Sequence, residues 1–331
     1  MRSRDAILEG AQAAARLHDQ LGVKADVEPP VGRIDVFGAL LATDAALIFR
    51  PLQGLLGACI KGPTTPGVII STQRPLRIQR FTGAHELGHV ILGHVFSLDG
   101  PEILGRTPGS WSDVEVAANS FASTFLLPKW LLQAHARRQS WNRESMSDPH
   151  AVYQLSLRVG ASYQATCIAL ERYGVIDATI REKLFAKERR RIKSELLEGL
   201  QLDNYYADVW SITERDEGLI IEGQPEDLFI LRLPEQAGAG YVWNITGLVE
   251  AGFAILRDKR EIPRPDEVIG GPVTRALTAR HDEPSSGAFT IELRRPWEAT
   301  ELPASVLHLN YELFGKEIGM PRAARQQLMA A

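Results

Sequence analysis

The sequence predicts an α+β protein, with a helical amino-terminal domain that contains a small sheet and an all-β sandwich at the carboxyl end. Three observations support this fold class. Helical patterns with two short apolar runs occupy residues 1–140, a helix-turn-helix-like segment and a charged helical connector occupy 141–200, and short alternating segments between Gly/Pro-rich turns fill 201–331. A chain of 331 residues is too long for one ordinary core. We therefore expect these three parts to be separate structural regions.

The composition excludes several classes of protein. Hydrophobic residues make up 44% of the chain and charged residues 24%, and the formal net charge of −4 gives no global attraction to nucleic acid or to an anionic membrane. Cys59 and Cys167 are the only cysteines, which argues against a disulfide framework or a cysteine-ligated metal cluster and indicates a reducing compartment. No apolar run approaches the roughly 18 residues of a membrane helix. We expect a cytoplasmic protein with no membrane partner.

The amino-terminal elements follow from periodicity and punctuation. Residues 1–20 form an amphipathic pattern that predicts a helix rather than a signal peptide, and Pro29-Pro30 mark a turn into a second helix near Arg33. Further along, apolar runs at 45–49 and 67–71 predict strands, and the patterns at 77–95 and 112–127 predict helices, the last opened by Ser112 and closed by Pro128.

The motif His85-Glu86-Leu87-Gly88-His89 lies on the predicted helix at 77–95. Residues at i and i+4 share one helical face, so both imidazoles can reach one metal ion, while Glu86 can accept a proton from a bound water. Zinc lowers the pKa of such a water to about 7. The alternative is an ordinary buried helix, because Val90-Ile91-Leu92 is apolar, but burying these three polar side chains without a partner would be costly. We therefore interpret the motif as a zinc site.

A catalytic zinc site needs a third protein ligand. His94 lies five residues after His89 and faces away from the pair, which favours a helix-end or supporting role. The acidic candidates downstream are Glu102, Asp113 and Glu115. Glu115 lies within a predicted helix, whereas the other two lie in or near a Gly/Pro-rich loop. A ligand on a packed helix is held more firmly than one on a loop.

The stretch FTGAHELGHVILGH, followed by EVAANSFASTFLLP, resembles the ImmA/IrrE family of metallopeptidases over about residues 1–175. That family pairs HELGH with E-x-x-A-N-x-F-A-x-x-L-L-x-P, and this chain matches at most positions but ends in LLP without the usual methionine. The resemblance implies a zincin-like domain with a gluzincin-like site, in which His85, His89 and Glu115 hold Zn²⁺ and Glu86 is the catalytic base. It also implies a protein substrate that is a helix-turn-helix transcriptional repressor.

Residues 152–174 resemble a helix-turn-helix, with a turn at Gly160-Ala161-Ser162. The second helix offers Tyr163, Gln164 and Thr166 near its start and Arg172 near its end. That is a weak basis for DNA binding, because few cations are available for phosphates. We favour a structural or substrate-presenting role for this segment.

The carboxy-terminal part resembles the chagasin-type cysteine-peptidase inhibitors, which have an immunoglobulin-like fold. Three segments carry the likeness: residues 233–243, Gly270-Gly271, and Arg295-Pro296-Trp297-Glu298. In the first of these the family's N-P-T-T is replaced by Gln236-Ala237-Gly238-Ala239. The loss of the proline and hydroxyls favours recognition of a peptide or protein ligand over inhibition of a cysteine peptidase. Tyr241, Trp243 and Trp297 could equally be core or rim aromatics of the sandwich.

These observations together predict a zinc metalloendopeptidase that cleaves a helix-turn-helix repressor and so derepresses a stress, phage or mobile-element response. The carboxy-terminal domain would sense a signal or select the target. The rival hypothesis is a non-cleaving, peptidase-like transcriptional regulator that binds a repressor or DNA.

Overall fold

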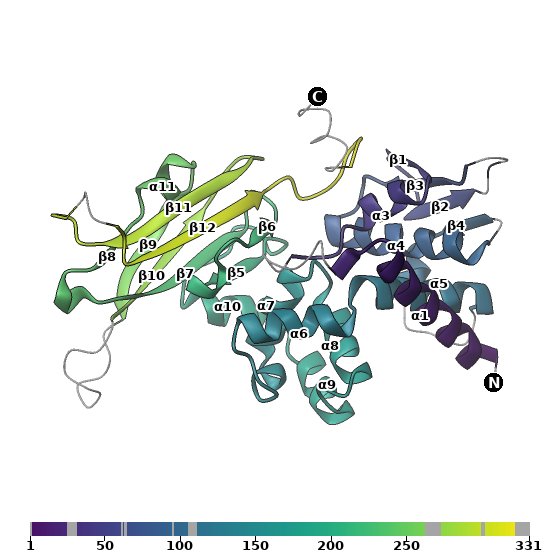
Figure 1. The fold of residues 1–331 in the computed structure, drawn as a ribbon, viewed down its shortest axis with the longest axis horizontal. Coiled ribbons are helices and arrows are strands. Elements are labelled where there is room, and N and C mark those ends of the chain that lie inside the picture. Colours follow the sequence, from purple (N-terminus) through teal and green to yellow (C-terminus); the bar gives the residue numbers. More distant parts are fainter. Residues whose placement is uncertain are drawn as a thin grey trace. The chain divides into compact units, whose positions relative to one another are not determined.

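The computed structural model describes residues 2–24, 32–60, 62, 65–94, 96–104, 111–261, 273–298 and 302–321 (Figure 1). The chain forms two compact units. Unit 1 comprises Met1–Gln133, Val159–Tyr173 and Lys316–Ala331, and unit 2 comprises Ala134–Arg158 and Gly174–Gly315. Within the described residues, no helix is both long and apolar enough to cross a membrane. Each unit mixes helices with sheet, and unit 2 contains the β-rich region.

Unit 1 contains a four-stranded sheet in the order β1-β3-β2-β4, formed by β1 (Ala46–Arg50), β2 (Gly57–Ile60), β3 (Gly67–Ser71) and β4 (Phe96–Asp99). Strand β1 is parallel to β3, whereas β2 is antiparallel to both of its neighbours. One face is buried through residues such as Phe49, Cys59, Val68 and Ile70. Strand β4 is an edge strand, and this position brings its last residue, Asp99, beside the helical layer.

The helices of unit 1 are α1 (Arg2–Gln20), α3 (Val36–Ala42), α4 (Leu76–Leu92), α5 (Asp113–Leu126) and α8 (Tyr163–Arg172), and α6 (Lys129–Arg138) begins in this unit. A short 3-10 turn, η1, spans Pro101–Leu104. Helix α4 ends at Gly93, whose φ of 74° is the left-handed conformation that commonly terminates helices. Ser112 caps α5 by accepting from the backbone N–H of Glu115. Asp35 caps α3 in the same way.

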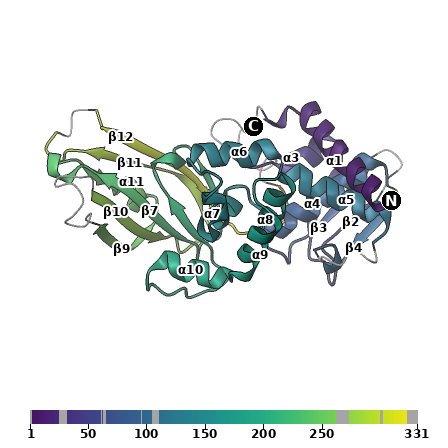
Figure 2. The ribbon, with the colours of Figure 1, turned by 90° about the horizontal axis from the view of Figure 1, so that it is seen from below.

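Helix α5 packs against both α1 and α4 (Figure 1 and Figure 2). Small residues allow this close approach. A Cβ on Gly88 would lie 3.2 Å from the Cα of Ala118 and from Phe121, and a Cβ on Gly10 would collide with the carbonyl of Ala117. Because α4 and α5 approach so closely, the first turn of α5 reaches the histidine-bearing face of α4.

Unit 2 is a sandwich of two four-stranded sheets, with the orders β5-β7-β10-β9 and β6-β12-β11-β8. The strands are β5 (Val209–Ile212), β6 (Ile220–Glu222), β7 (Leu228–Glu235), β8 (Val242–Asn244), β9 (Ala254–Glu261), β10 (Val273–Arg280), β11 (Ser286–Arg294) and β12 (Ser305–Glu312), with the short helix α11 (Thr246–Glu250) after β8. Its core gathers Trp210, Trp243, Phe253 and aliphatic residues from both sheets. This interior of alternating inward residues is what the spacing of the apolar segments predicts.

Helix α7 (Pro149–Arg158) covers the edge strand β5 of this sandwich. The Gln154 side chain donates to the carbonyl of Val209 and accepts from the N–H of Ser211, so its amide replaces a neighbouring strand. The Tyr153 hydroxyl accepts from the N–H of Val209. Exposed strand edges invite unwanted pairing, and these side chains satisfy that edge.

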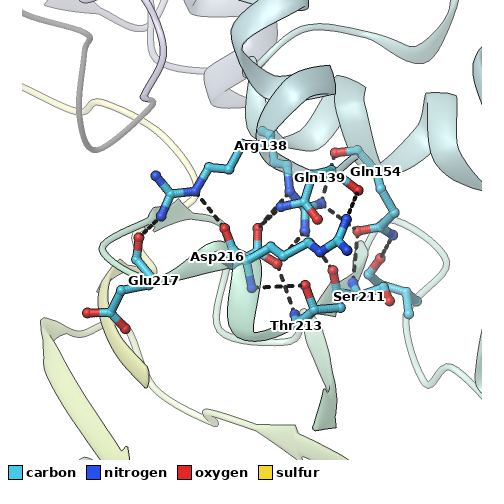
Figure 3. Close-up of polar contacts among 10 residues, drawn as sticks. Arg138, Gln139, Gln154, Ser211, Thr213, Asp216 and Glu217 are labelled. Carbon is cyan, nitrogen blue, oxygen red and sulfur yellow. Dashed lines mark hydrogen bonds and ion pairs between the residues drawn. The ribbon is translucent and has the colours of Figure 1, made fainter. Parts of the chain in front are cut away.

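A buried polar network around Asp216 ties α7 to the turn after β5 (Figure 3). The Arg158 guanidinium binds Asp216, in the 3-10 turn η3 (Glu214–Asp216), through two hydrogen bonds of 2.9 and 3.0 Å, and both side chains are 1% exposed. Asp216 also accepts from Gln139 and from the N–H of Thr213. Arg138 donates to backbone carbonyls of the same turn. Residues 134–158 are therefore a built-in part of the sandwich unit.

The helices expected between residues 141 and 200 can be compared with the observed ones. The predicted helix-turn-helix consists of α7 and α8, joined through Gly160 at φ 66° and Ser162 as the cap of α8, but the two helices belong to different units. The charged connector is helical, as expected, and consists of two helices, α9 (Ala178–Ala186) and α10 (Arg189–Leu197). The turn at Pro29-Pro30 and the loop at Gly270-Gly271 lie outside the described residues.

Candidate metal centre

Four side chains from three elements of unit 1 converge beside α4. His85 and His89 lie one turn apart on α4, Glu115 is in the first turn of α5, and Asp99 ends β4. One donor atom from each residue lies within 4.8 Å of every other. The two Nε2 atoms are 3.0 Å apart, and Glu115 Oε2 lies 3.2 and 3.7 Å from those of His85 and His89.

This geometry fits a divalent cation. Donors of a tetrahedral zinc ion, at about 2.0–2.1 Å from the metal, are separated by about 3.3 Å, close to the three distances above. Two imidazoles and a carboxylate are also ordinary zinc donors. Both histidines are fully buried. Buried polar groups without a partner are costly, so their convergence on one point favours a bound cation there.

Glu86 lies beside this cluster and is fully buried. Its Oε2 accepts a 2.7 Å hydrogen bond from the hydroxyl of Ser97 on β4, while Oε1 has no hydrogen-bond donor among the described residues. Burial raises the pKa of the Glu86 carboxyl well above its usual range, and the adjacent Asp99 raises it further. A carboxylate held at one oxygen and free at the other, with a raised pKa, is suited to accepting a proton.

Two further side chains hold the histidine rings. His85 Nδ1 is 3.2 Å from Asn119 Oδ1 on α5, so Nδ1–H donates to the amide oxygen and Nε2 is left to face the cluster. His89 Nδ1 is 2.8 Å from His94 Nδ1, just beyond the end of α4. Metal-binding histidines commonly have such partners, which fix the tautomer and the ring orientation. The spacing predicts that His94 faces away from the pair on a continuous helix, but α4 ends at Leu92 and His94 contacts His89. This position gives His94 a supporting role.

The carboxylates make the cluster strongly attractive to positive charge. Burial alone would lower the pKa of His85, but Asp99 and Glu115 outweigh it and raise that pKa to about 9. In return, hydrogen bonds from His85 and His89 hold the pKa of Glu115 well below its usual range. Without a cation, a proton on His85 supplies the positive charge. A divalent cation would therefore release that proton on binding.

The structure brings all four sequence-predicted residues together: His85, Glu86, His89 and Glu115. Among the described residues, the other two acidic candidates are not part of the cluster: Glu102 accepts from the backbone N–H of Gly100, and Asp113 is exposed at the start of α5. Sequence reasoning missed Asp99 and Ser97, both on β4. The motif spacing carries no signal for them, since their proximity depends on β4 returning along the sheet edge.

Two regions of the chain match models of known protein families. Residues 48–171 match the IrrE N-terminal-like domain. All residues of the cluster lie within that match, which indicates a metallopeptidase-like domain and implies a metal. Residues 224–311 match the chagasin family of peptidase inhibitors, so the chain combines these two domains. No curated protein matches the chain.

The chain is also similar to several solved structures. They include the cysteine protease inhibitor EhICP2 from Entamoeba histolytica, with 22% identity, 33% of this chain and 99% of that chain covered, and a TM-score of 0.29. Amebosin shows 15% identity over 32% of this chain and 97% of its own, with a TM-score of 0.25. PbICP-C, solved in complex with falcipain-2, shows 14% identity over 34% and 97%, with a TM-score of 0.21.

Two of the three loop segments of the chagasin-like domain are described and contact each other. Arg295 donates to the carbonyl of Ala239, and its guanidinium lies 4.6 Å from the centre of the Tyr241 ring. Trp297 lies over Gly240, where any side chain would collide with the indole, and is 69% exposed. Trp243, by contrast, is buried in the sandwich core and donates to the carbonyl of Pro234. Of the two tryptophans, Trp243 is therefore a core residue, and Trp297 is an exposed loop residue.

Proposed function

We propose that this protein is a zinc-dependent endopeptidase whose zinc ion is held by His85, His89 and Glu115. The observation that carries the proposal is the convergence of these three donors with Glu86 buried beside them. Zinc bound there would polarise the scissile carbonyl and make water a stronger nucleophile. Glu86 is the general base, because its Oε1 has no donor and Ser97 fixes the rest of the carboxylate.

The proposed substrate is a helix-turn-helix transcriptional repressor, whose cleavage switches on a stress, phage or mobile-element response. The match to the IrrE N-terminal-like domain supports a regulatory metallopeptidase, and the resemblance to the ImmA/IrrE family supports the repressor. The chain itself is poorly suited to reading DNA through α8. Arg172, the basic residue of that helix, donates to the side chain and carbonyl of Ser123 on α5.

The test compares the wild type with Glu86→Gln, an isosteric change that removes the base but no proposed zinc ligand. Each protein is incubated with candidate helix-turn-helix repressors from the same genome, and products are mapped by mass spectrometry. We expect both proteins to bind one zinc ion and the wild type alone to cleave. Cleavage by Glu86→Gln at the wild-type rate would contradict the role of Glu86. A zinc-loaded wild type that cuts nothing but shifts operator DNA would favour the non-cleaving regulator.

A second function is supported for the chagasin-like domain, namely binding of a peptide or protein ligand by its loops. The specific observation is Trp297, a large aromatic side chain left 69% exposed on a loop braced by Arg295. Exposed aromatic anchors of this kind commonly dominate protein interfaces. Trp297→Ala should weaken capture of the repressor, measured by calorimetry, while Leu302→Ala, which is more exposed and not part of the braced loops, should not.

A further inference from the structure

Asp99 is held rigidly at the edge of the metal centre. It pairs with Gly57 in the β2–β4 ladder, and its carbonyl accepts a 2.7 Å hydrogen bond from the N–H of Leu56. The residue is 3% exposed, and its Oδ1 lies 3.6 Å from His85 Nε2. The backbone therefore directs this carboxylate into the cluster.

Asp99 faces His85 and lies against the buried carboxyl of Glu86. Its Oδ2 has no hydrogen-bond donor among the described residues, and the same is true of Oε1 on the adjacent Glu86. Two buried carboxyls side by side are unfavourable unless they share a proton or positive charge lies beside them, and a bound cation would supply that charge. The unsatisfied Asp99 oxygen is an observation independent of the convergence of the histidines.

The histidine nitrogen that Asp99 faces shows whether this carboxylate only orients a metal-binding histidine or binds the metal itself. A carboxylate that only orients a metal-binding histidine accepts from the nitrogen remote from the metal. Here both remote nitrogens are occupied, His85 Nδ1 by Asn119 and His89 Nδ1 by His94. Asp99 instead lies against His85 Nε2, on the side where the donors converge.

We propose that Asp99 is a fourth protein donor to the cation, so that the resting centre is a His-His-Asp-Glu site. This inference rests on the proposed function, since it places one more ligand at the same centre. Four protein donors close a zinc site, whereas catalytic sites keep one position open. Peptide cleavage would then require the Asp99 carboxylate to withdraw, which makes the resting enzyme latent.

The test measures metal binding rather than cleavage. The full-length chain is stripped of metal and titrated with Co²⁺, whose visible absorption reports the number and kind of donors, and with Zn²⁺ against a chromophoric chelator. Asp99→Ala and Asp99→Asn are compared with the wild type. Glu102→Gln is the matched control, because Glu102 lies three residues away, is exposed, and its contact to Gly100 N–H can be kept by an amide oxygen.

We expect both Asp99 variants to change the cobalt spectrum and to bind zinc more than about 100-fold more weakly, beyond the usual effect of losing a supporting hydrogen bond. Glu102→Gln should match the wild type in both measurements. The cobalt spectrum decides whether Asp99 is a metal ligand. If it is unchanged in both Asp99 variants, whatever the affinity, Asp99 is not a ligand and the proposed endopeptidase is unaffected. A wild type that binds neither metal would overturn the proposed function as well.

Discussion

The carboxylate of Glu86 occupies the space above Gly57, where a Cβ would lie 2.7 Å from Glu86 Oε1 and would also collide with Thr82. Gly57 is on the central strand β2, opposite Asp99. The absence of a side chain at this position therefore lets the proposed base reach the metal centre.

We predict that Gly57→Ala displaces Glu86 and lowers cleavage by at least about 100-fold, the lower end of the range for general-base catalysis, while zinc stoichiometry is retained. The control is Gly67→Ala on β3, where a Cβ would meet only the carbonyl of Ile60 at 3.9 Å. Thermal melts of both variants distinguish displacement of Glu86 from unfolding. Wild-type cleavage by Gly57→Ala would show that the Glu86 carboxylate tolerates a shift.

Asn119 should matter for metal affinity although it touches no metal. Its Oδ1 accepts from His85 Nδ1, which leaves Nε2 to face the cation. We predict that Asn119→Ala weakens zinc binding by about 10- to 100-fold, the usual effect of removing such a support. Chelator competition measures the change. Val114→Ala, an exposed position on the same helix, serves as the control, and equal affinities for the two variants would refute this role.

The metal centre shows which parts could be predicted from the sequence. His85, Glu86 and His89 follow from helical periodicity, and Glu115 from the second motif, because all four depend on local spacing or on a known pairing of motifs. Asp99 depends on a non-local event, the return of β4 beside β2. Strand β2 itself was hidden within a Gly/Pro-rich stretch, since Gly57–Ile60 is only four residues long and contains one strong strand former.

The strands of the sandwich also show which features can be predicted from the sequence and which cannot. Strand β12 (Ser305–Glu312) shows the alternating pattern by which the sequence predicts strands, because its inward and outward residues alternate. Strand β10 lacks this alternation, because as a central strand it is buried over most of its length, including two polar residues. The burial of Arg275 there is compensated by Asp258, Glu235 and the carbonyl of Trp243, which contact its guanidinium. The sequence alone does not show that a buried arginine has such partners.

His18 should make unit 1 sensitive to acid. Burial lowers the pKa of its imidazole, which donates to the carbonyl of Phe125 and is 7% exposed. The unfolded chain then binds a proton more readily than the folded one, so stability is full above pH 6.5, the ordinary histidine value, and falls as the pH drops below it. We predict that the wild type loses more thermal stability between pH 7.5 and 5 than His18→Gln, whose amide can still donate to Phe125. Parallel pH curves for the two proteins would exclude His18 as the cause.

The Arg158–Asp216 pair should be far more important to stability than the ion pairs on the surface. Both side chains are buried, so Asp216→Asn leaves the guanidinium without its countercharge and weakens a network that also holds Gln139 and the N–H of Thr213. Removing one partner of a buried pair costs about 3–5 kcal/mol, whereas an exposed pair contributes at most about 1 kcal/mol. Asp203→Asn is the control, because Asp203 pairs with Arg280 but is largely exposed. Denaturant unfolding of the full chain should show the large loss for Asp216→Asn alone, and equal small losses would mean that Arg158 is satisfied by the carbonyls of Gln154 and Ser211.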